Sequence, residues 1–188
     1  MKLDFKNKRV VVIGAGLSGQ ALVRFLVERG ATVALSDLRN REQIEGLAAL
    51  DELPIRLDLG GHSLQLFEQA DFIAVSPGVP LDCEPLRLAS SCGIPLLGEI
   101  EIAAREITVP IIGVTGTNGK STTTSLIGEI MQAWDKKVFV GGNLGTPLIE
   151  ACSAEIAGVV VELSSFQLET IDQFHPAIGL LLNKPRSS

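Results

Sequence analysis

The sequence predicts an α/β protein in which a Rossmann-like parallel-sheet domain precedes part of a P-loop α/β domain. Short β-branched runs, such as residues 10–13 and 111–114, alternate along the chain with segments of helical periodicity. Glycine-rich turns follow both runs, at residues 14–19 and 113–119, and each turn opens a helical segment. Apolar residues make up 46% of the 188 residues and aromatic residues only 4%, which is typical of parallel strands buried under helices.

The composition argues against several classes of protein. A net charge of −6 and the scarcity of aromatic side chains disfavour a general nucleic-acid binder. No apolar run approaches the roughly 18 residues that a membrane helix needs, so we expect no membrane partner. The three cysteines, Cys83, Cys92 and Cys152, form no metal-binding or redox spacing, and their odd number suits a reducing cytoplasm.

The N-terminal part has the pattern of a dinucleotide-binding unit. We expect a strand at 9–13, a GxGxxG turn at 14–19, a helix at 20–29, a second strand at 31–35 and then Asp37. Glycines in such a turn let the backbone approach a phosphate, and an acid about 20 residues later commonly binds a ribose hydroxyl. The pattern predicts a nucleotide site with Asp37 on the ribose, but it leaves the identity of the nucleotide open.

The rest of the first domain, which we expect to span residues 1–97, continues the alternation. We predict a helix at 42–50, strands at 55–59 and 71–75, a helix at 85–91 and a short strand at 94–97. The turn at 76–80, which contains Gly78, follows one of these strands, where open α/β sheets bind ligands. A ligand contact and a rigid Pro-Gly turn are both compatible with it. His62 follows two glycines and is interpreted as a loop residue.

The second domain is expected to span residues 98–188 and to be truncated, with a short acidic helix at 99–106 as its connector. An apolar strand at 109–114 leads into a P-loop segment and a helix at 120–134; that segment reads Gly116, Thr117, Asn118, Gly119, Lys120, Ser121 and Thr122. The backbone N–H groups of such a loop cradle phosphates. Lys120 would reach the β- and γ-phosphates, and Ser121 would place its hydroxyl on Mg²⁺. Val114 stands where the usual pattern has glycine, and a turn that binds nothing is the alternative.

Two further strand ends carry polar groups. A strand at 137–140 precedes the glycine-rich loop at 141–145, where Asn143 is a candidate for a phosphate or sugar contact; a structural turn is the alternative. A strand at 158–161 ends at Glu162. A carboxylate in this place beside a P-loop suits Mg²⁺, which prefers oxygen ligands. A helix-capping role for this carboxylate is the alternative.

Four segments together resemble one known family, the Mur ligases. They are the glycine turn at 14–19, Ser76-Pro77-Gly78, the P-loop at 113–121 and Glu162-Leu163-Ser164-Ser165-Phe166-Gln167-Leu168, with Gly141-Gly142-Asn143 beside them. The family's P-loop has the variant spacing that Val114 produces, and the resemblance extends from residue 8 to about residue 183. The resemblance is strongest to the branch that joins D-glutamate to UDP-N-acetylmuramoyl-L-alanine in peptidoglycan synthesis. That synthesis belongs to cell wall biogenesis and is needed for cell shape and cell division.

The resemblance implies roles for the matching residues. The first domain would bind the UDP part of the substrate, not NAD, and the substrate-binding residues would be Leu17, Ser18, Asp37, Arg39, Gly78, Asn143, Ser164 and Gln167. Residues 116–122 would bind ATP, Ser121 and Glu162 would bind Mg²⁺, and Lys120 and Glu162 would be catalytic. The implied cytoplasmic reaction is ATP-driven amide formation: the substrate carboxylate attacks the γ-phosphorus to give an acyl phosphate, and the amine of D-glutamate displaces phosphate.

The chain departs from the family after Asn183. The last expected strand, at 176–182, is followed by Lys184-Pro185-Arg186-Ser187-Ser188. The family continues instead with further Mg²⁺-binding residues and a C-terminal domain that binds D-glutamate. We therefore expect this chain to bind ligands without ligating them by itself. We also expect its uncovered sheet edge and apolar surface to cause self-association or low stability.

Three alternative functions stay open. A nicotinamide (NAD)-dependent oxidoreductase would use the first domain but leaves Lys120 and the Glu162 segment unexplained. A P-loop kinase or ATPase leaves the first domain unexplained. A non-catalytic nucleotide-binding module that acts through a protein partner is consistent with the missing ligase groups.

Overall fold

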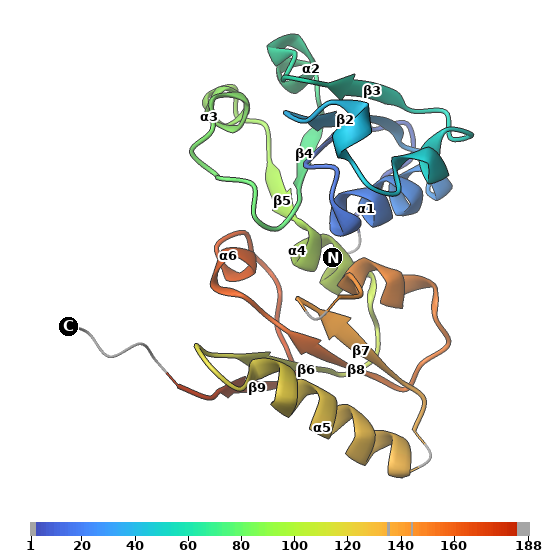
Figure 1. Ribbon diagram of the computed structural model, residues 1–188, viewed down its shortest axis with the longest axis vertical. Coiled ribbons are helices and arrows are strands. Elements are labelled where there is room, and N and C mark those ends of the chain that lie inside the picture. Colours follow the sequence, from blue (N-terminus) through green and yellow to red (C-terminus); the bar gives the residue numbers. More distant parts are fainter. Residues whose placement is uncertain (1–2, 135, 144, 184–188) are drawn as a thin grey trace, which may run out of the picture.

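Two parallel β-sheets, one above the other in Figure 1, organise the chain in this computed structural model, which describes residues 3–134, 136–143 and 145–183. The first sheet has the order β3-β2-β1-β4-β5 and is formed by β1 (Arg9–Ile13), β2 (Thr32–Asp37), β3 (Arg56–Leu59), β4 (Phe72–Val75) and β5 (Leu96–Gly98). The second has the order β7-β8-β6-β9 and is formed by β6 (Ile111–Thr115), β7 (Val138–Gly142), β8 (Gly158–Glu162) and β9 (Ile178–Leu181). The predicted α/β fold class is confirmed.

Helices cover both faces of the first sheet. On one face, α1 (Leu17–Glu28) and α4 (Glu99–Glu106) contribute Leu22, Leu26 and Ile102 to a core that also contains alternate residues of β1 and β2. On the other face, α2 (Leu64–Glu68) and α3 (Glu84–Ser91) pack over a smaller cluster around Phe67 and Ile73. This arrangement explains why the central strands are apolar along their whole length.

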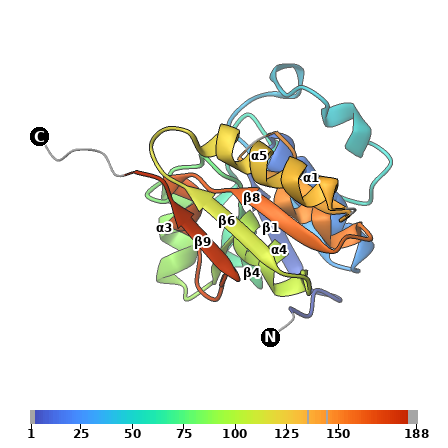
Figure 2. The same ribbon diagram turned by 90° about the horizontal axis from the view of Figure 1, so that it is seen from below.

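The second sheet is covered by α5 (Lys120–Ala133), which packs on β6, β7 and β8, and by the 3₁₀ segment η3 (Leu148–Ser153). The short helix α6 (Ser165–Leu168) follows β8 (Figures 1 and 2). Seen from below in Figure 2, β9 lies at the edge of this sheet, and no described strand pairs with its outer side. Ile178 and Leu181 of β9 are more than half exposed. Self-association through this edge stays a prediction.

The element boundaries differ from the expected ones in a few places. The predicted helix at 42–50 is wrong, because Gly46 adopts a left-handed φ of 76° and separates two short 3₁₀ segments, η1 (Arg41–Gln43) and η2 (Leu47–Leu50). The helix α2 and the segment η3 were not predicted. Gly141 and Gly142, expected in a loop, are the last residues of β7. The predicted tail at 184–188 lies outside the described residues.

Helix α4 joins the two sheets through two buried carboxylates. Glu99 accepts a hydrogen bond from Ile149 N in η3 at 2.7 Å. Glu101, which is fully buried, accepts hydrogen bonds from the backbone N–H groups of residues 172, 173 and 174 at 2.9–3.1 Å and from Arg105 Nε at 2.5 Å. Because Ile100 and Ile102 of α4 enter the first core, one helix packs on the first sheet and binds the turn before β9.

The Glu101→Gln variant should be less stable to urea than the parent chain by about 2–3 kcal/mol at pH 7, because an amide N–H₂ would face backbone donors. Burial acts to raise the pKa of Glu101, but hydrogen bonds from residues 172–174 and Arg105 lower it overall. A lowered folded-state pKa contributes stability above the unfolded-state value near 4.5 that is lost as the pH falls. The difference between the two proteins should therefore shrink below about pH 4. Glu68→Gln, on an exposed side chain, is the matched control. Equal stability of the Glu101→Gln variant and the parent at pH 7 would contradict this account.

Candidate functional site

The carboxyl ends of strands from both sheets converge on one cleft of about 420 Å³, here named the inter-sheet cleft. Its walls come from the glycine turn after β1, the end of β2, the turn after β4, the loop after β7 and helix α6. The predicted substrate residues that line it are Leu17, Ser18, Asp37, Arg39, Gly78, Asn143 and Gln167. Residues as far apart in the sequence as Gly14 and Gln167 therefore share one cavity.

Ser164 is the predicted substrate residue that does not line this cleft. It caps helix α6: Ser164 Oγ accepts a hydrogen bond from Gln167 N at 3.2 Å, and Ser164 N donates to Gln167 Oε1 at 2.9 Å. This reciprocal capping box satisfies free N–H groups at the start of the helix. Ser164 thus holds the Gln167 side chain, which is itself buried and lines the cleft.

The glycine turn after β1 has a shape that only glycine permits. Gly14 has a φ of +92°, in a region that other residues rarely adopt. A Cβ on Gly19 would lie 1.8 Å from the carbonyl oxygen of Gly14, so the first turn of α1 packs directly on the loop. Ser76 Oγ donates to the same carbonyl at 2.8 Å and links the turn after β4 to it. The amino end of α1 is thereby placed at the cleft.

Asp37 is held by its own surroundings. Its Oδ2 accepts hydrogen bonds from Ala15 N at 2.7 Å and Arg39 Nη2 at 2.8 Å, and its Oδ1 accepts from Arg39 Nε at 3.0 Å and Arg39 N at 2.9 Å. Burial acts to raise the pKa of Asp37, but these hydrogen bonds outweigh it and lower the pKa to about 2. Asp37 therefore orients Arg39 and the glycine turn, a role that the sequence pattern did not indicate.

The segment interpreted as a P-loop lies between β6 and α5, with Gly119 at a left-handed φ of 82° immediately before α5. Lys120 Nζ donates to the loop's own carbonyl oxygens, Gly116 O at 2.9 Å and Thr117 O at 3.3 Å. The N–H groups of Thr117 and Asn118 donate to Asn183 Oδ1 at 2.8 and 3.0 Å.

Asn183 is a residue that the sequence analysis did not assign to the site. It follows β9, whose carboxyl end lies beside the P-loop strand because β6 and β9 are parallel neighbours. That adjacency is the signal that could have identified it.

Glu162 is buried at the end of β8 and connects two predicted site residues. Its Oε2 accepts a hydrogen bond from Ser121 Oγ at 2.7 Å, and its Oε1 accepts one from Asn143 Nδ2 at 2.8 Å. The carboxylate thus joins the start of α5 to the loop after β7. A hydroxyl and a carboxylate oxygen about 3 Å apart fit neighbouring ligand positions of Mg²⁺, which binds oxygen at short distances. Among the described residues, no group of three or more acidic, histidine or cysteine side chains forms a closed metal site.

His62 belongs to a structural network beside β3. Its Nδ1 lies 2.7 Å from Ser36 Oγ, which donates to Asp58 Oδ2 at 2.7 Å. The pKa of His62 is lowered, chiefly by burial of the ring, although nearby Asp58 and Asp37 act to raise it. These contacts agree with the interpretation of His62 as a loop residue.

In the described part of the chain, no helix is both long and apolar enough to cross a membrane.

Comparisons with protein families match both halves of the chain. Residues 8–98 match the N-terminal domain of the MurD-like Mur ligases, and residues 114–184 match the Mur ligase middle domain. The boundary between the two matches contains helix α4, which joins the two sheets in the structure.

Curated relatives carry the name UDP-N-acetylmuramoylalanine--D-glutamate ligase. The protein from Syntrophotalea carbinolica is 54% identical over 96% of this chain, and the protein from Geobacter sp. strain M21 is 47% identical over 96% of it. The matched regions make up 40% and 41% of those two proteins, so the chain spans about two fifths of the length of its relatives.

Solved structures show the same fold. The UDP-N-acetylmuramate:L-alanyl-gamma-D-glutamyl-meso-diaminopimelate ligase from Neisseria meningitides matches with a TM-score of 0.61 and 18% identity, over 96% of this chain and 62% of that one. The murein peptide ligase from Psychrobacter arcticus matches with a TM-score of 0.59 and 15% identity, over 95% of this chain and 43% of that one. By its matched N-terminal and middle domains and by its curated relatives, this chain belongs to the Mur ligase family.

Proposed function

We propose that this chain forms the UDP-substrate-binding domain, residues 1–97, and part of the ATP-binding domain, from residue 98, of a cytoplasmic ligase that adds D-glutamate to UDP-N-acetylmuramoyl-L-alanine. The observation that carries the proposal is the inter-sheet cleft, where the glycine turn, Arg39 and Asn143 meet. The names of the curated relatives support the same reaction.

The diphosphate of the substrate is assigned to the glycine turn and Arg39. Helix α1 begins at Leu17, and the free N–H groups and positive end of a helix attract phosphate. Arg39 is half-exposed at the cleft, and Asp37 fixes the direction of its guanidinium group. Asn143 and Gln167, from the second sheet and α6, are assigned to the muramoyl-alanine part.

The phosphates of ATP are assigned to residues 116–122 and to the amino end of α5. Lys120 would exchange its contacts with the loop carbonyls for the β- and γ-phosphates. Ser121 Oγ and Glu162 would hold Mg²⁺, which, when bound, supplies positive charge between the substrate carboxylate and the γ-phosphate. The protein's contribution is positioning, because two negatively charged reactants approach only where fixed cations and N–H donors face them.

The reaction supported by this arrangement proceeds in two steps. The substrate carboxylate attacks the γ-phosphorus of ATP, the bond to the β-phosphate oxygen breaks, and an acyl phosphate and ADP result. The amine of D-glutamate then attacks the acyl carbon and displaces inorganic phosphate, leaving an amide. In this scheme Lys120 and Glu162 act on the first step.

The nicotinamide-dependent oxidoreductase is less well supported than the ligase. A ribose hydroxyl would need a free acceptor on Asp37, but each oxygen of that carboxylate already accepts two hydrogen bonds, one from Ala15 N and three from Arg39 in all. The non-catalytic nucleotide-binding module differs from the ligase proposal only in what the complete protein does with the bound nucleotides.

The Arg39→Ala variant should bind UDP-N-acetylmuramoyl-L-alanine roughly tenfold more weakly in calorimetric titration, because a charge-assisted hydrogen bond to phosphate is lost. Arg41→Ala is the matched control. Arg41 lies two positions after Arg39, pairs with Asp51 and does not line the cleft. An equal loss in both variants would indicate general electrostatics and contradict the assignment of the diphosphate to Arg39.

In the presence of Mg²⁺, the Glu162→Gln variant should bind ATP about tenfold more weakly than the parent, because the metal loses its carboxylate ligand. In EDTA, the variant and the parent should bind ATP with the same affinity. The amide oxygen of glutamine can still accept the Asn143 hydrogen bond, so the fold should be retained. Glu150→Gln, on a half-exposed side chain paired with Arg24, serves as the control. A loss of ATP affinity that is the same with and without Mg²⁺ would argue against a metal-binding Glu162.

The pure 188-residue chain should form no amide when it is incubated with ATP, Mg²⁺, the UDP-substrate and D-glutamate. Its relatives are about two and a half times as long, as the 40% coverage implies, and the family resemblance assigns the D-glutamate pocket to the remaining part. Product formation measured by mass spectrometry would overturn this expectation, whereas binding without product would agree with it.

A further inference from the structure

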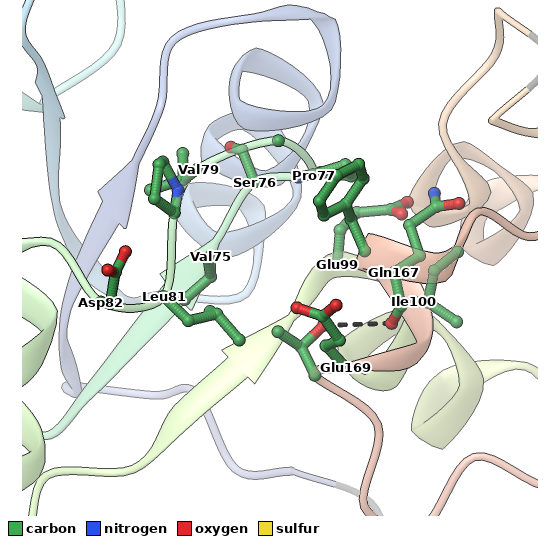
Figure 3. A pocket seen from close by; sticks show the side chains of 14 residues that line it. Val75, Ser76, Pro77, Val79, Leu81, Asp82, Glu99, Ile100, Gln167 and Glu169 are labelled. Carbon is green, nitrogen blue, oxygen red and sulfur yellow. Dashed lines mark hydrogen bonds between the residues drawn. The ribbon is translucent and has the colours of Figure 1, made fainter. Parts of the chain in front are cut away.

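A second cleft of about 490 Å³ lies between the turn after β4 and helix α6. We name it the α4–α6 cleft and define it by Leu81, Asp82, Glu99, Ile100, Phe166 and Glu169 (Figure 3). It shares the turn after β4 and Gln167 with the inter-sheet cleft, but neither Arg39 nor the glycine turn lines it. None of the six residues that define this cleft has been assigned a role in the proposed ligase reaction.

Glu99 gives the cleft a buried carboxyl oxygen without a partner. The side chain is 1% exposed, and its Oε1 accepts a hydrogen bond from Ile149 N at 2.7 Å. Its Oε2 has no hydrogen-bond partner among the described residues. In Figure 3 the Glu99 carboxyl group extends toward Gln167 at the side of the cleft. An unpaired buried carboxyl oxygen costs free energy, which a ligand that donates a hydrogen bond would offset.

The charged side chains that line the cleft favour a ligand with a positive charge. Asp82, Glu99 and Glu169 are acidic, and none of the residues that line the cleft is a lysine, arginine or histidine. Phosphate or carboxylate ligands would meet only like charge there. Bare metal ions are disfavoured as well, because no three acidic, histidine or cysteine side chains of the described chain converge as metal ligands.

The apolar walls of the cleft favour a ligand that carries an apolar group. Leu81, Ile100 and Phe166 line it together with the last valine of β4 and the prolines and valine of the turn that follows. The Phe166 side chain is 64% exposed, although it borders a cavity. Apolar and aromatic walls with a few buried polar groups, here Ser76, Glu99 and Gln167, are typical of sites for small organic molecules. An aromatic face near a cation adds a further attraction.

We propose that the α4–α6 cleft binds a small organic cation, an amine or amidine on an apolar or aromatic group, whose N–H donates to Glu99 Oε2. The turn after β4 belongs to the first sheet and α6 to the second, so the ligand would contact both. The proposal rests on Glu99 and the apolar wall, which have no part in the proposed function, although the cleft shares the turn after β4 and Gln167 with the inter-sheet cleft.

The pKa of Glu99 is raised to about 7, chiefly by burial and to a smaller extent by the charge of Glu150, against the lowering effect of the N–H groups of Ile149 and Leu148. The other charged groups at the cleft, Asp82 and Glu169, are exposed. Glu99 should therefore lose its proton between about pH 6 and pH 8, and the affinity for a cation should rise across that interval.

The test is calorimetric titration of the chain with benzylamine, using benzyl alcohol as a neutral probe of similar shape. The parent chain should bind benzylamine at least about tenfold more tightly than benzyl alcohol at pH 8, because the hydrogen bond is charge-assisted. Glu99→Gln should abolish this preference and the rise in affinity between pH 6 and pH 8. Asp82→Asn, which removes an exposed charge from the same cleft, should retain both.

A second variant keeps the test independent of folding. Phe166→Ala, at an exposed side chain, should weaken both probes several-fold through lost wall contact, whereas Leu126→Ala on α5 should weaken neither. Circular dichroism melts verify that each variant is folded. The proposal is overturned if the parent does not prefer benzylamine, if its affinity is the same at pH 6 and pH 8, or if Glu99→Gln and Asp82→Asn lose affinity equally.

Discussion

The buried carboxylate of Glu162 is the point on which the candidate site depends. It ends the central strand β8 and accepts hydrogen bonds from Ser121 at the start of α5 and from Asn143 after β7. Because β6, β7 and β8 are parallel, their carboxyl ends present these three groups at one edge of the sheet. A single side chain thereby links the start of α5 to the loop that faces the inter-sheet cleft.

A second constraint fixes how the two sheets are placed relative to each other. The carboxylates of Glu99 and Glu101 lie on α4, which packs into the first core, and they accept backbone N–H groups of the second half of the chain. Buried carboxylates that accept several backbone hydrogen bonds are costly to displace. The inter-sheet cleft and the α4–α6 cleft both form along this joint, so the geometry of the two cavities depends on the same helix.

Much of the site could be predicted from local pattern, because glycine turns, Lys120-Ser121 and strand-terminal acids act through short-range geometry. The sequence also placed Arg39 and Asn143 in one substrate site through family resemblance, and both line the inter-sheet cleft. Three features depend on tertiary contacts and were not predicted: the ion pair of Asp37 with Arg39, the contact of Asn183 with residues 117 and 118, and the unpaired Glu99 oxygen. The helix expected at 42–50 was wrong because Gly46 takes a left-handed conformation.

The central claim, that the inter-sheet cleft receives a UDP-sugar, is tested most directly by nuclear magnetic resonance of the ¹⁵N-labelled chain. UDP-N-acetylmuramoyl-L-alanine and NADH are titrated separately, and backbone amide signals are followed. The account predicts that the UDP-sugar shifts the signals of residues 14–18, Arg39 and Asn143 together, and that NADH at the same concentration leaves them unchanged. Shifts of these signals with NADH but not with the UDP-sugar would contradict it.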